Sequence, residues 1–168
     1  MTRPPPGDDV ESAERIGRSY DRYGAALYRY AVMILADPSG AADAVHEVFV
    51  SLLRSRATPQ AEEQYLRRAV RNECYSALRR RTRDIVTPVD APLLEAVAAH
   101  DDRPDTRLAL EHLLRELPAE QREAVHLKVF EGMTFQEIAA TTGESINTIA
   151  SRYRYAIDKL RGRMGARR

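Results

Sequence analysis

The sequence predicts an all-α protein with two small helical domains, joined by a flexible acidic linker, and with a helix-turn-helix in the C-terminal domain. Three observations predict this fold class. Apolar residues recur at three- and four-residue steps through most of the chain, which is the period of an amphipathic helix. No stretch shows a convincing strand alternation. The helical pattern is interrupted once at length, between Thr82 and Thr106.

The N-terminal half carries three helical patterns, through residues 20–35, 41–53 and 65–78. The sequence "DPSG" at residues 37–40 ends the first pattern, and Asp37 or Ser39 can cap the second helix. We expect this domain to span residues 13–83. Residues 1–12 contain three consecutive prolines and are expected to form a disordered tail.

A Pro-rich, acidic segment separates the two halves. After Val89 it carries five acidic residues against the single base Arg103. Domains are commonly joined by polar, Pro-rich segments of this kind. We therefore expect a linker over residues 84–106 and a second domain over residues 107–168.

The second domain ends in a short helix, a turn and a longer helix, and local signals mark each boundary. Thr134 can cap the short helix, and Glu137 stands where it would complete a capping box. Gly143 ends that helix at a corner where positive φ favours glycine, and Ser145 can cap the longer helix. This succession is typical of a helix-turn-helix.

One face of the longer helix carries side chains that can bond nucleic acid. Asn can bond adenine, Arg can bond guanine through two hydrogen bonds, and Ser and Thr can bond bases or phosphates. The chain has a net charge of only +1, yet seven basic residues stand against one acid from Ile146 to Arg168. Phosphate binding requires such a local excess of positive charge. The structural alternative is a solvated face of a helical bundle. The candidate contact residues are Asn147, Thr148, Ser151, Arg152 and Arg154.

A second basic segment lies near the end of the N-terminal domain. Tyr65, Asn72 and Tyr75 are interleaved with its arginines. Aromatic rings can stack on unpaired bases while positive charge follows the phosphate backbone, so this composition suits single-stranded DNA. The alternative is that both tyrosines belong to the core and the arginines only make the helix soluble. The arginines are Arg67, Arg68, Arg71, Arg79, Arg80, Arg81 and Arg83.

Composition excludes several other classes of site. Cys74 is the single cysteine, so no internal disulfide forms, and the four histidines lack metal-ligand spacing. Glu120 and Glu123 are expected on a polar helical face without a His or Ser constellation, so we expect no enzyme and no cofactor. No signal peptide is recognisable and no apolar run approaches the ~20 residues of a membrane span. A cytoplasmic protein is expected.

These motifs resemble those of the bacterial sigma-70 family of RNA polymerase sigma factors, in the extracytoplasmic-function (ECF) group that keeps only regions 2 and 4. Region 2 is similar to "ADAVHEVFVSLLR" at residues 42–54 and "YLRRAVRNECYSALRRR" at residues 65–81. Region 4 is similar to "LPAEQREAVHLKVFEGMTFQEIAATTGESINTIASRYRYAIDKLR" at residues 117–161. The region 4 similarity is the more specific.

The resemblance implies partners and a role for each set of residues. The partners are core RNA polymerase, promoter DNA and, as is common in this group, an anti-sigma factor, with no small-molecule substrate. Val48 and Phe49 would pack inside region 2. The implied core-polymerase contacts are Asp43, His46 and Glu47, the minus-10 contacts are Arg67, Arg71, Asn72, Arg79 and Arg80, and the minus-35 contacts are Asn147, Thr148, Ser151, Arg152 and Arg154.

The chain departs from the family pattern at several positions. Gln is usual at His46, Trp at Tyr65, Gly is common at Asn147 and Lys at Ala150, and residues 55–64 form a short segment without the usual aromatic residue and glycine. An alternative function is a stand-alone helix-turn-helix transcription regulator, which would bind a palindrome as a dimer without polymerase. The basic aromatic helix and the acidic stripe in the first half favour the sigma factor.

Overall fold

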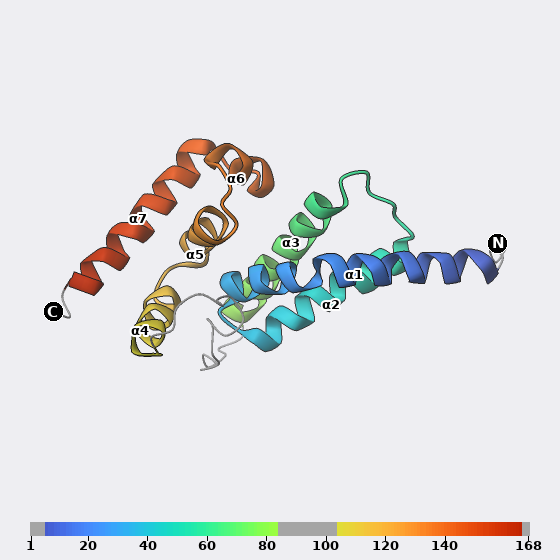
Figure 1. Ribbon diagram of the computed structural model, residues 1–168, viewed down its shortest axis with the longest axis horizontal. Helices are drawn as coiled ribbons and strands as arrows, with labels where there is room; N and C mark the ends of the chain where they lie inside the picture. Colours follow the sequence, from blue (N-terminus) through green and yellow to red (C-terminus); the bar gives the residue numbers. More distant parts are fainter. Residues whose placement is uncertain (1–5, 84–103, 166–168) are drawn as a thin grey trace.

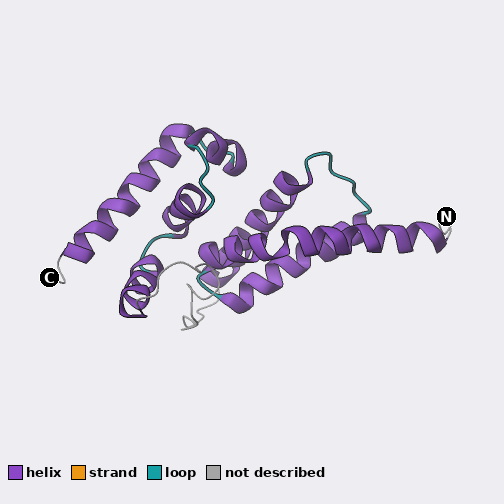
Figure 2. Ribbon diagram, viewed as in Figure 1, coloured by secondary structure: helices purple, strands orange, loops and turns teal. Residues whose placement is uncertain are grey.

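The computed structural model describes residues 6–83 and 104–165, which are helical apart from short connections and contain no strand (Figures 1 and 2). This confirms the all-α expectation. In chain order the helices are α1 Pro6–Leu35, α2 Pro38–Ser55, α3 Glu62–Arg83, α4 Pro104–Arg115, α5 Ala119–Val125, η1 His126–Phe130, α6 Phe135–Thr142 and α7 Ile146–Gly165.

Two boundaries differ from those expected. Residues 6–12, expected to belong to a disordered tail, form the first turns of α1. Proline is tolerated at the first helical position because its missing N–H would have no intrahelical partner there. Helix α4 begins at Pro104 for the same reason, so the last expected linker residues are helical. The rest of the expected linker, residues 84–103, lies outside the described residues.

Helices α1, α2 and α3 pack together into an N-terminal unit. Helix α2 is capped by Asp37, whose carboxylate accepts a hydrogen bond from the backbone N–H of Ser39 at 3.0 Å. Asp37 also pairs with Arg81, which ties the end of α3 to the start of α2. Val48 and Phe49 are buried, as expected.

Helices α4 to α7 form a C-terminal unit in which α7 packs against α5 and α6. The capping box between Thr134 and Glu137 is present, and Gly143 ends α6 with φ +75°. Ser145 caps α7 by accepting a hydrogen bond from the backbone N–H of Thr148 at 3.0 Å. The predicted boundary residues of the helix-turn-helix are therefore confirmed.

The two units also pack against each other. Helix α5 contacts α1, and α6 contacts α3, so segments far apart in the sequence lie side by side (Figure 1). We refer to the surface where α5 and α6 meet α1 and α3 as the seam. The sequence indicated two domains but no contact between them.

Candidate nucleic-acid and polymerase interface

The acidic face of α2 is open to solvent. Asp43, His46 and Glu47 are all exposed, and their three- and four-residue spacing places them on one side of the helix. Beside them, a groove of about 710 Å³ runs between α2 and α3, lined by Asp43 and Glu47 from α2 and by Glu73, Arg80 and Arg81 from α3. Glu73 pairs with Arg80 at 2.8 Å, so the acceptors for a basic partner helix come from Asp43 and Glu47.

The predicted minus-10 residues are divided into two groups by their surroundings. Asn72, Arg79 and Arg80 are exposed on α3, whereas Arg71 is partly buried and Arg67 is only 8% exposed. Tyr65 is 43% exposed, so it does not take the core role that the alternative interpretation gave it, whereas Tyr75 is partly buried and packs against the core as that interpretation expected. Helix α3 therefore offers part of its basic and aromatic surface to solvent and holds the rest in the seam.

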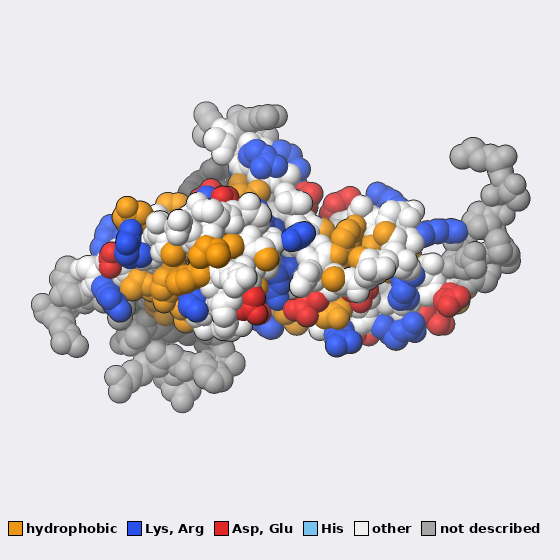
Figure 3. All heavy atoms as spheres, turned by 90° about the horizontal axis from the view of Figure 1, so that it is seen from above, with side chains coloured by type: hydrophobic (Ala, Val, Ile, Leu, Met, Phe, Trp, Pro, Cys, Tyr) orange, Lys and Arg blue, Asp and Glu red, His pale blue; other side chains and the backbone are white. Residues whose placement is uncertain are grey.

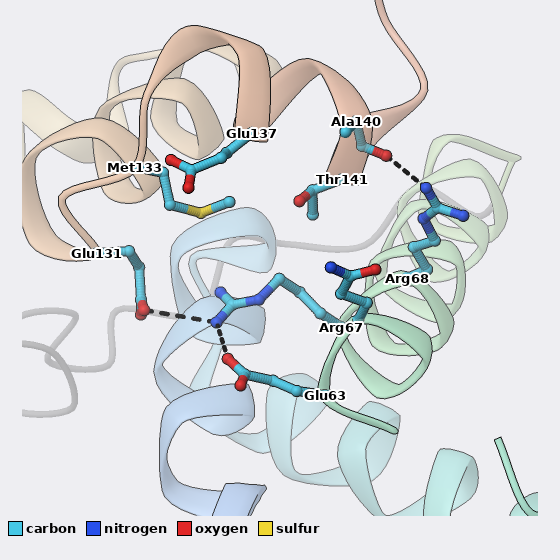
Figure 4. Close-up of a pocket in the computed structure, with 9 residues that line it drawn as sticks. Glu63, Arg67, Arg68, Glu131, Met133, Glu137, Ala140 and Thr141 are labelled. Carbon is cyan, nitrogen blue, oxygen red and sulfur yellow. Dashed lines mark hydrogen bonds and ion pairs between the residues drawn. The ribbon is translucent and has the colours of Figure 1, made fainter. Parts of the chain in front are cut away.

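Two arginines near the start of α3 contact the C-terminal unit. Arg67 pairs with Glu63 at 3.3 Å and, across the seam, with Glu131 at 3.5 Å. Arg68 donates a hydrogen bond to the backbone oxygen of Ala140 at 2.5 Å. These residues border a cavity of about 320 Å³ between α3 and α6 (Figure 4). The cavity is part of the seam, not a separate pocket in either unit.

A buried carboxylate organises the centre of the seam. Glu123 is 2% exposed and accepts hydrogen bonds from Tyr30 at 2.5 Å and Tyr75 at 2.7 Å. Arg71 binds both of its oxygens, from Nε at 2.8 Å and from Nη2 at 3.2 Å. Burial and the Glu123 charge raise the pKa of both tyrosines further above neutral pH, and both hydroxyls are hydrogen-bond donors to the carboxylate. The pKa of Arg71 is raised as well, because attraction to Glu123 outweighs its burial.

The expectation that Glu123 lies on a polar helical face is wrong. Helix α5 uses that face to dock on α1 and α3, and burying the carboxylate is tolerated because four hydrogen bonds satisfy it. Its neighbour Arg122 is also buried, at 5% exposed. Nothing in the local sequence distinguishes these two residues from a solvated Arg-Glu pair.

The predicted minus-35 residues all lie on the first turns of α7. Asn147 and Arg154 are exposed, while Thr148, Ser151 and Arg152 are partly buried. Arg152 pairs with Glu144 at 3.2 Å. A cavity of about 280 Å³ is lined by Arg152 together with Arg71, Asn72 and Arg79 of α3. The structure thus brings members of both predicted DNA-binding sets to one place.

Figure 3 shows the charged side chains on one face of the molecule. Viewed from the side of α6 and α7, positive and negative side chains are interspersed, with no continuous basic strip among the described residues on this face (Figure 3). Within residues 6–83 and 104–165, no group of three or more His, Cys, Asp or Glu residues could hold a metal ion. None of the described helices is long and apolar enough to cross a membrane.

A helix-turn-helix and a second basic, aromatic helix in one all-α chain are typical of a DNA-binding protein. Comparison with known proteins identifies the class. The sigma-70 region 2 family matches residues 19–84, and the sigma-70 region 4 family matches residues 107–160. The chain belongs to the sigma-70 family of RNA polymerase sigma factors, in its ECF group.

Individual relatives agree with this membership. The ECF sigma factor SigL of Mycobacterium tuberculosis is 30% identical over 157 residues, which cover 84% of each chain. SigE of Mycolicibacterium smegmatis is 32% identical over 144 residues, 80% of this chain, and the match spans 56% of SigE. The sigma factor RpoE of Bartonella quintana, solved in complex with the anti-sigma factor NepR, has the same fold with a TM-score of 0.68 at 23% identity, covering 92% of this chain and 99% of RpoE.

Family membership establishes the general role. The protein is a sigma factor, which binds core RNA polymerase and promoter DNA and acts in promoter recognition at transcription initiation. Sigma factors in general are regulators and not enzymes.

Proposed function

We propose that this sigma factor docks on core polymerase through α2, reads the minus-10 element with α3 and reads the minus-35 element with α7. The observation that carries the proposal is the presence, in one chain, of two basic helices with base-bonding side chains on separate units. An exposed acidic face on a third helix supplies the polymerase contact. No catalytic group is required by this role, so we propose that the chain has no enzymatic activity, no cofactor and no small-molecule substrate.

The proposed minus-35 contact uses the start of α7 in the major groove. Asn147 and Arg154 are exposed there and carry the amide and guanidinium groups suited to adenine and guanine edges. Thr148 and Ser151 add hydroxyls that suit phosphates or bases. Arg152 can join them once it leaves Glu144. Because Ala150 offers no charge where Lys is common in the family, base recognition in this chain rests on the remaining side chains.

The proposed minus-10 contact uses α3 on separated strands. Exposed Tyr65 can stack on an unpaired base, Asn72 can bond the edge of an extruded base, and Arg79 and Arg80 can follow the phosphates. Trapping an extruded base offsets a few kcal/mol of the cost of unstacking it. Promoter melting is therefore assigned to this helix.

The proposed polymerase contact uses Asp43, His46 and Glu47. Exposure of Asp43 and Glu47 on one face of α2 allows their carboxylates to pair with arginines of a basic partner helix, and His46 lies exposed beside them. Once the protein is docked on polymerase, binding of the second promoter element becomes intramolecular. Two DNA contacts that are weak alone then give tight binding to the promoter. An anti-sigma factor, as found in the RpoE complex, is proposed as a further partner. The cytoplasm is the proposed location.

The decisive experiment adds the purified chain to core RNA polymerase with fragmented genomic DNA and maps the transcript starts. We expect initiation from a set of sites that share two sequence elements. Glu47→Arg, which should weaken docking on core polymerase, is expected to reduce initiation at those sites. The alternative, a stand-alone regulator, would instead show dimeric binding to a palindrome without polymerase and no initiation on any fragment.

A further inference from the structure

We propose that Tyr155 of α7 determines specificity for the minus-35 element, by contacting the methyl group of a thymine that adjoins the guanine bound by Arg154. The inference rests on the proposed minus-35 role of α7. It adds a side chain outside the set of contacts that the sequence predicted. It also gives the minus-35 element a chemical feature, which is a thymine next to a guanine.

Tyr155 is a large side chain that the fold leaves in solvent. It is 59% exposed, whereas Ile149 and Ala156 of the same helix are buried. Tyr153, two residues earlier, packs edge-to-face on Phe135 with the ring centres 5.6 Å apart. The packing of α7 therefore uses Tyr153 and not Tyr155. A single exposed apolar residue is normal on a protein surface, so exposure alone assigns no role to the ring.

Tyr155 shares one side of α7 with the proposed base contacts. Asn147, Ser151 and Tyr155 follow one another at four-residue steps, and Arg154 lies three residues after Ser151. Helix α7 runs along the outside of the C-terminal unit (Figure 1). A recognition helix contacts base edges with the side that enters the major groove. The Tyr155 ring would therefore enter the groove together with Asn147 and Arg154.

The ring of Tyr155 also contacts Arg154 directly. The guanidinium carbon of Arg154 lies 5.6 Å from the centre of the Tyr155 ring, which is within the range of a cation–π attraction. Successive side chains on a helix ordinarily point in different directions, so this contact brings the two side chains together. Arginine can stack its face on an aromatic ring and still bind guanine through two hydrogen bonds. The ring then lies beside the base pair that Arg154 binds.

The chemistry of the base edges decides what the ring contacts there. In the major groove thymine presents an apolar methyl group, whereas the other groups on the base edges donate or accept hydrogen bonds. A ring placed against a hydrogen-bonding group would leave that group without a partner, which costs free energy. A ring placed against the methyl group buries apolar surface, and one buried methyl group is worth about fourfold in affinity. The neighbouring base is therefore a thymine.

The test measures competition binding of the holoenzyme to duplexes that carry the minus-35 element of a promoter mapped by transcript starts. Each thymine is replaced singly by deoxyuridine, which still pairs with adenine and lacks only the methyl group. We expect one such replacement to weaken binding about fourfold. That position should adjoin a guanine whose replacement by 7-deazaguanine, which lacks the N7 acceptor, weakens binding about fivefold or more. Arg154→Ala should remove this dependence on guanine.

Variants of Tyr155 separate its ring from its hydroxyl. Tyr155→Ala should bind the promoter about fourfold more weakly and should no longer distinguish thymine from deoxyuridine at that position. Tyr155→Phe keeps the ring and should bind as the unaltered chain does. The matched control is Tyr20→Ala on α1, where the tyrosine is 52% exposed, and it should retain the dependence on the methyl group. Because Tyr155 is exposed, its replacement by alanine leaves the core contacts of α7 in place.

Three results would overturn the inference. The first is that no deoxyuridine weakens binding of the unaltered holoenzyme, and the second is that Tyr155→Ala keeps the full dependence on the methyl group. The third is an equal loss on every sequence with Tyr155→Phe, which would assign the hydroxyl to a phosphate. Failure of the proposed minus-35 role looks different. In that case Asn147→Ala and Arg154→Ala keep the promoter preference at every position, whereas failure of the inference alone leaves the guanine preference of Arg154 intact.

Discussion

Replacing Arg122 with methionine should destabilise the protein more than any surface substitution. Arg122 is 5% exposed and donates to Met33 oxygen at 2.5 Å, Ile34 oxygen at 2.7 Å and Leu117 oxygen at 2.7 Å. The first two carbonyls end α1, and Leu117 follows α4. Carbonyls in the last turn of a helix lack intrahelical partners, so one guanidinium of the C-terminal unit completes helix ends in both units.

The size of the effect follows from these bonds. A hydrogen bond to a charged group contributes about 1.5–3 kcal/mol, and a buried acceptor left without a partner costs about 1–3 kcal/mol. Three orphaned carbonyls set an upper limit near 9 kcal/mol on those values, but undocking of the C-terminal unit lets water reach the end of α1. We therefore expect Arg122→Met to lose about 3–5 kcal/mol, which lies between the cost of one orphaned carbonyl and the limit for three.

Urea unfolding followed by circular dichroism measures this loss. Burial lowers the pKa of Arg122 to about 10, so the side chain is still charged at pH 7 and the comparison is unaffected by titration. Arg122→Lys keeps the charge but not the fork of donors and should lose about half as much. Arg161→Met, an exposed arginine on α7, should change stability by less than about 0.5 kcal/mol. A loss below about 1 kcal/mol for Arg122→Met would refute the assignment of these bonds as a structural support.

Three further outcomes are expected. Glu47→Arg should weaken binding to core polymerase and leave duplex minus-35 DNA binding unchanged; equal losses in the two assays would contradict the docking role. Arg152→Ala should cost about 1–3 kcal/mol of discrimination between minus-35 variants, measured by competition binding of the holoenzyme, and unchanged preference would mean that Arg152 reads no base. Cys74, whose pKa is raised to about 12 by burial and nearby carboxylates, should react with a thiol reagent at pH 8 only as fast as the protein unfolds, and rapid labelling of folded protein would contradict its burial.

Local features of this fold were predictable from sequence because each depends on a few neighbouring residues. The capping box of Thr134 and Glu137 and the positive φ of Gly143 follow from hydrogen bonds and sterics within one turn. Exposure of Asp43 and Glu47 on one face of α2 follows from helical spacing alone. The start of α1 was misplaced because consecutive prolines precede a helix as readily as they form a tail.

The seam was not predictable because the local sequence around its residues fits a solvated helix surface as well as a buried contact. Arg122 and Glu123 look like a solvated pair, and only long-range packing against α1 and α3 determines that they are buried. The aromatic and arginine residues of α3 predicted a polyanionic partner. That prediction describes the chemistry of the partner and leaves its identity open, since a carboxylate on α5 and a phosphate on DNA satisfy the same guanidinium. A basic surface predicted to bind DNA is therefore also suited to an acidic helix of its own chain.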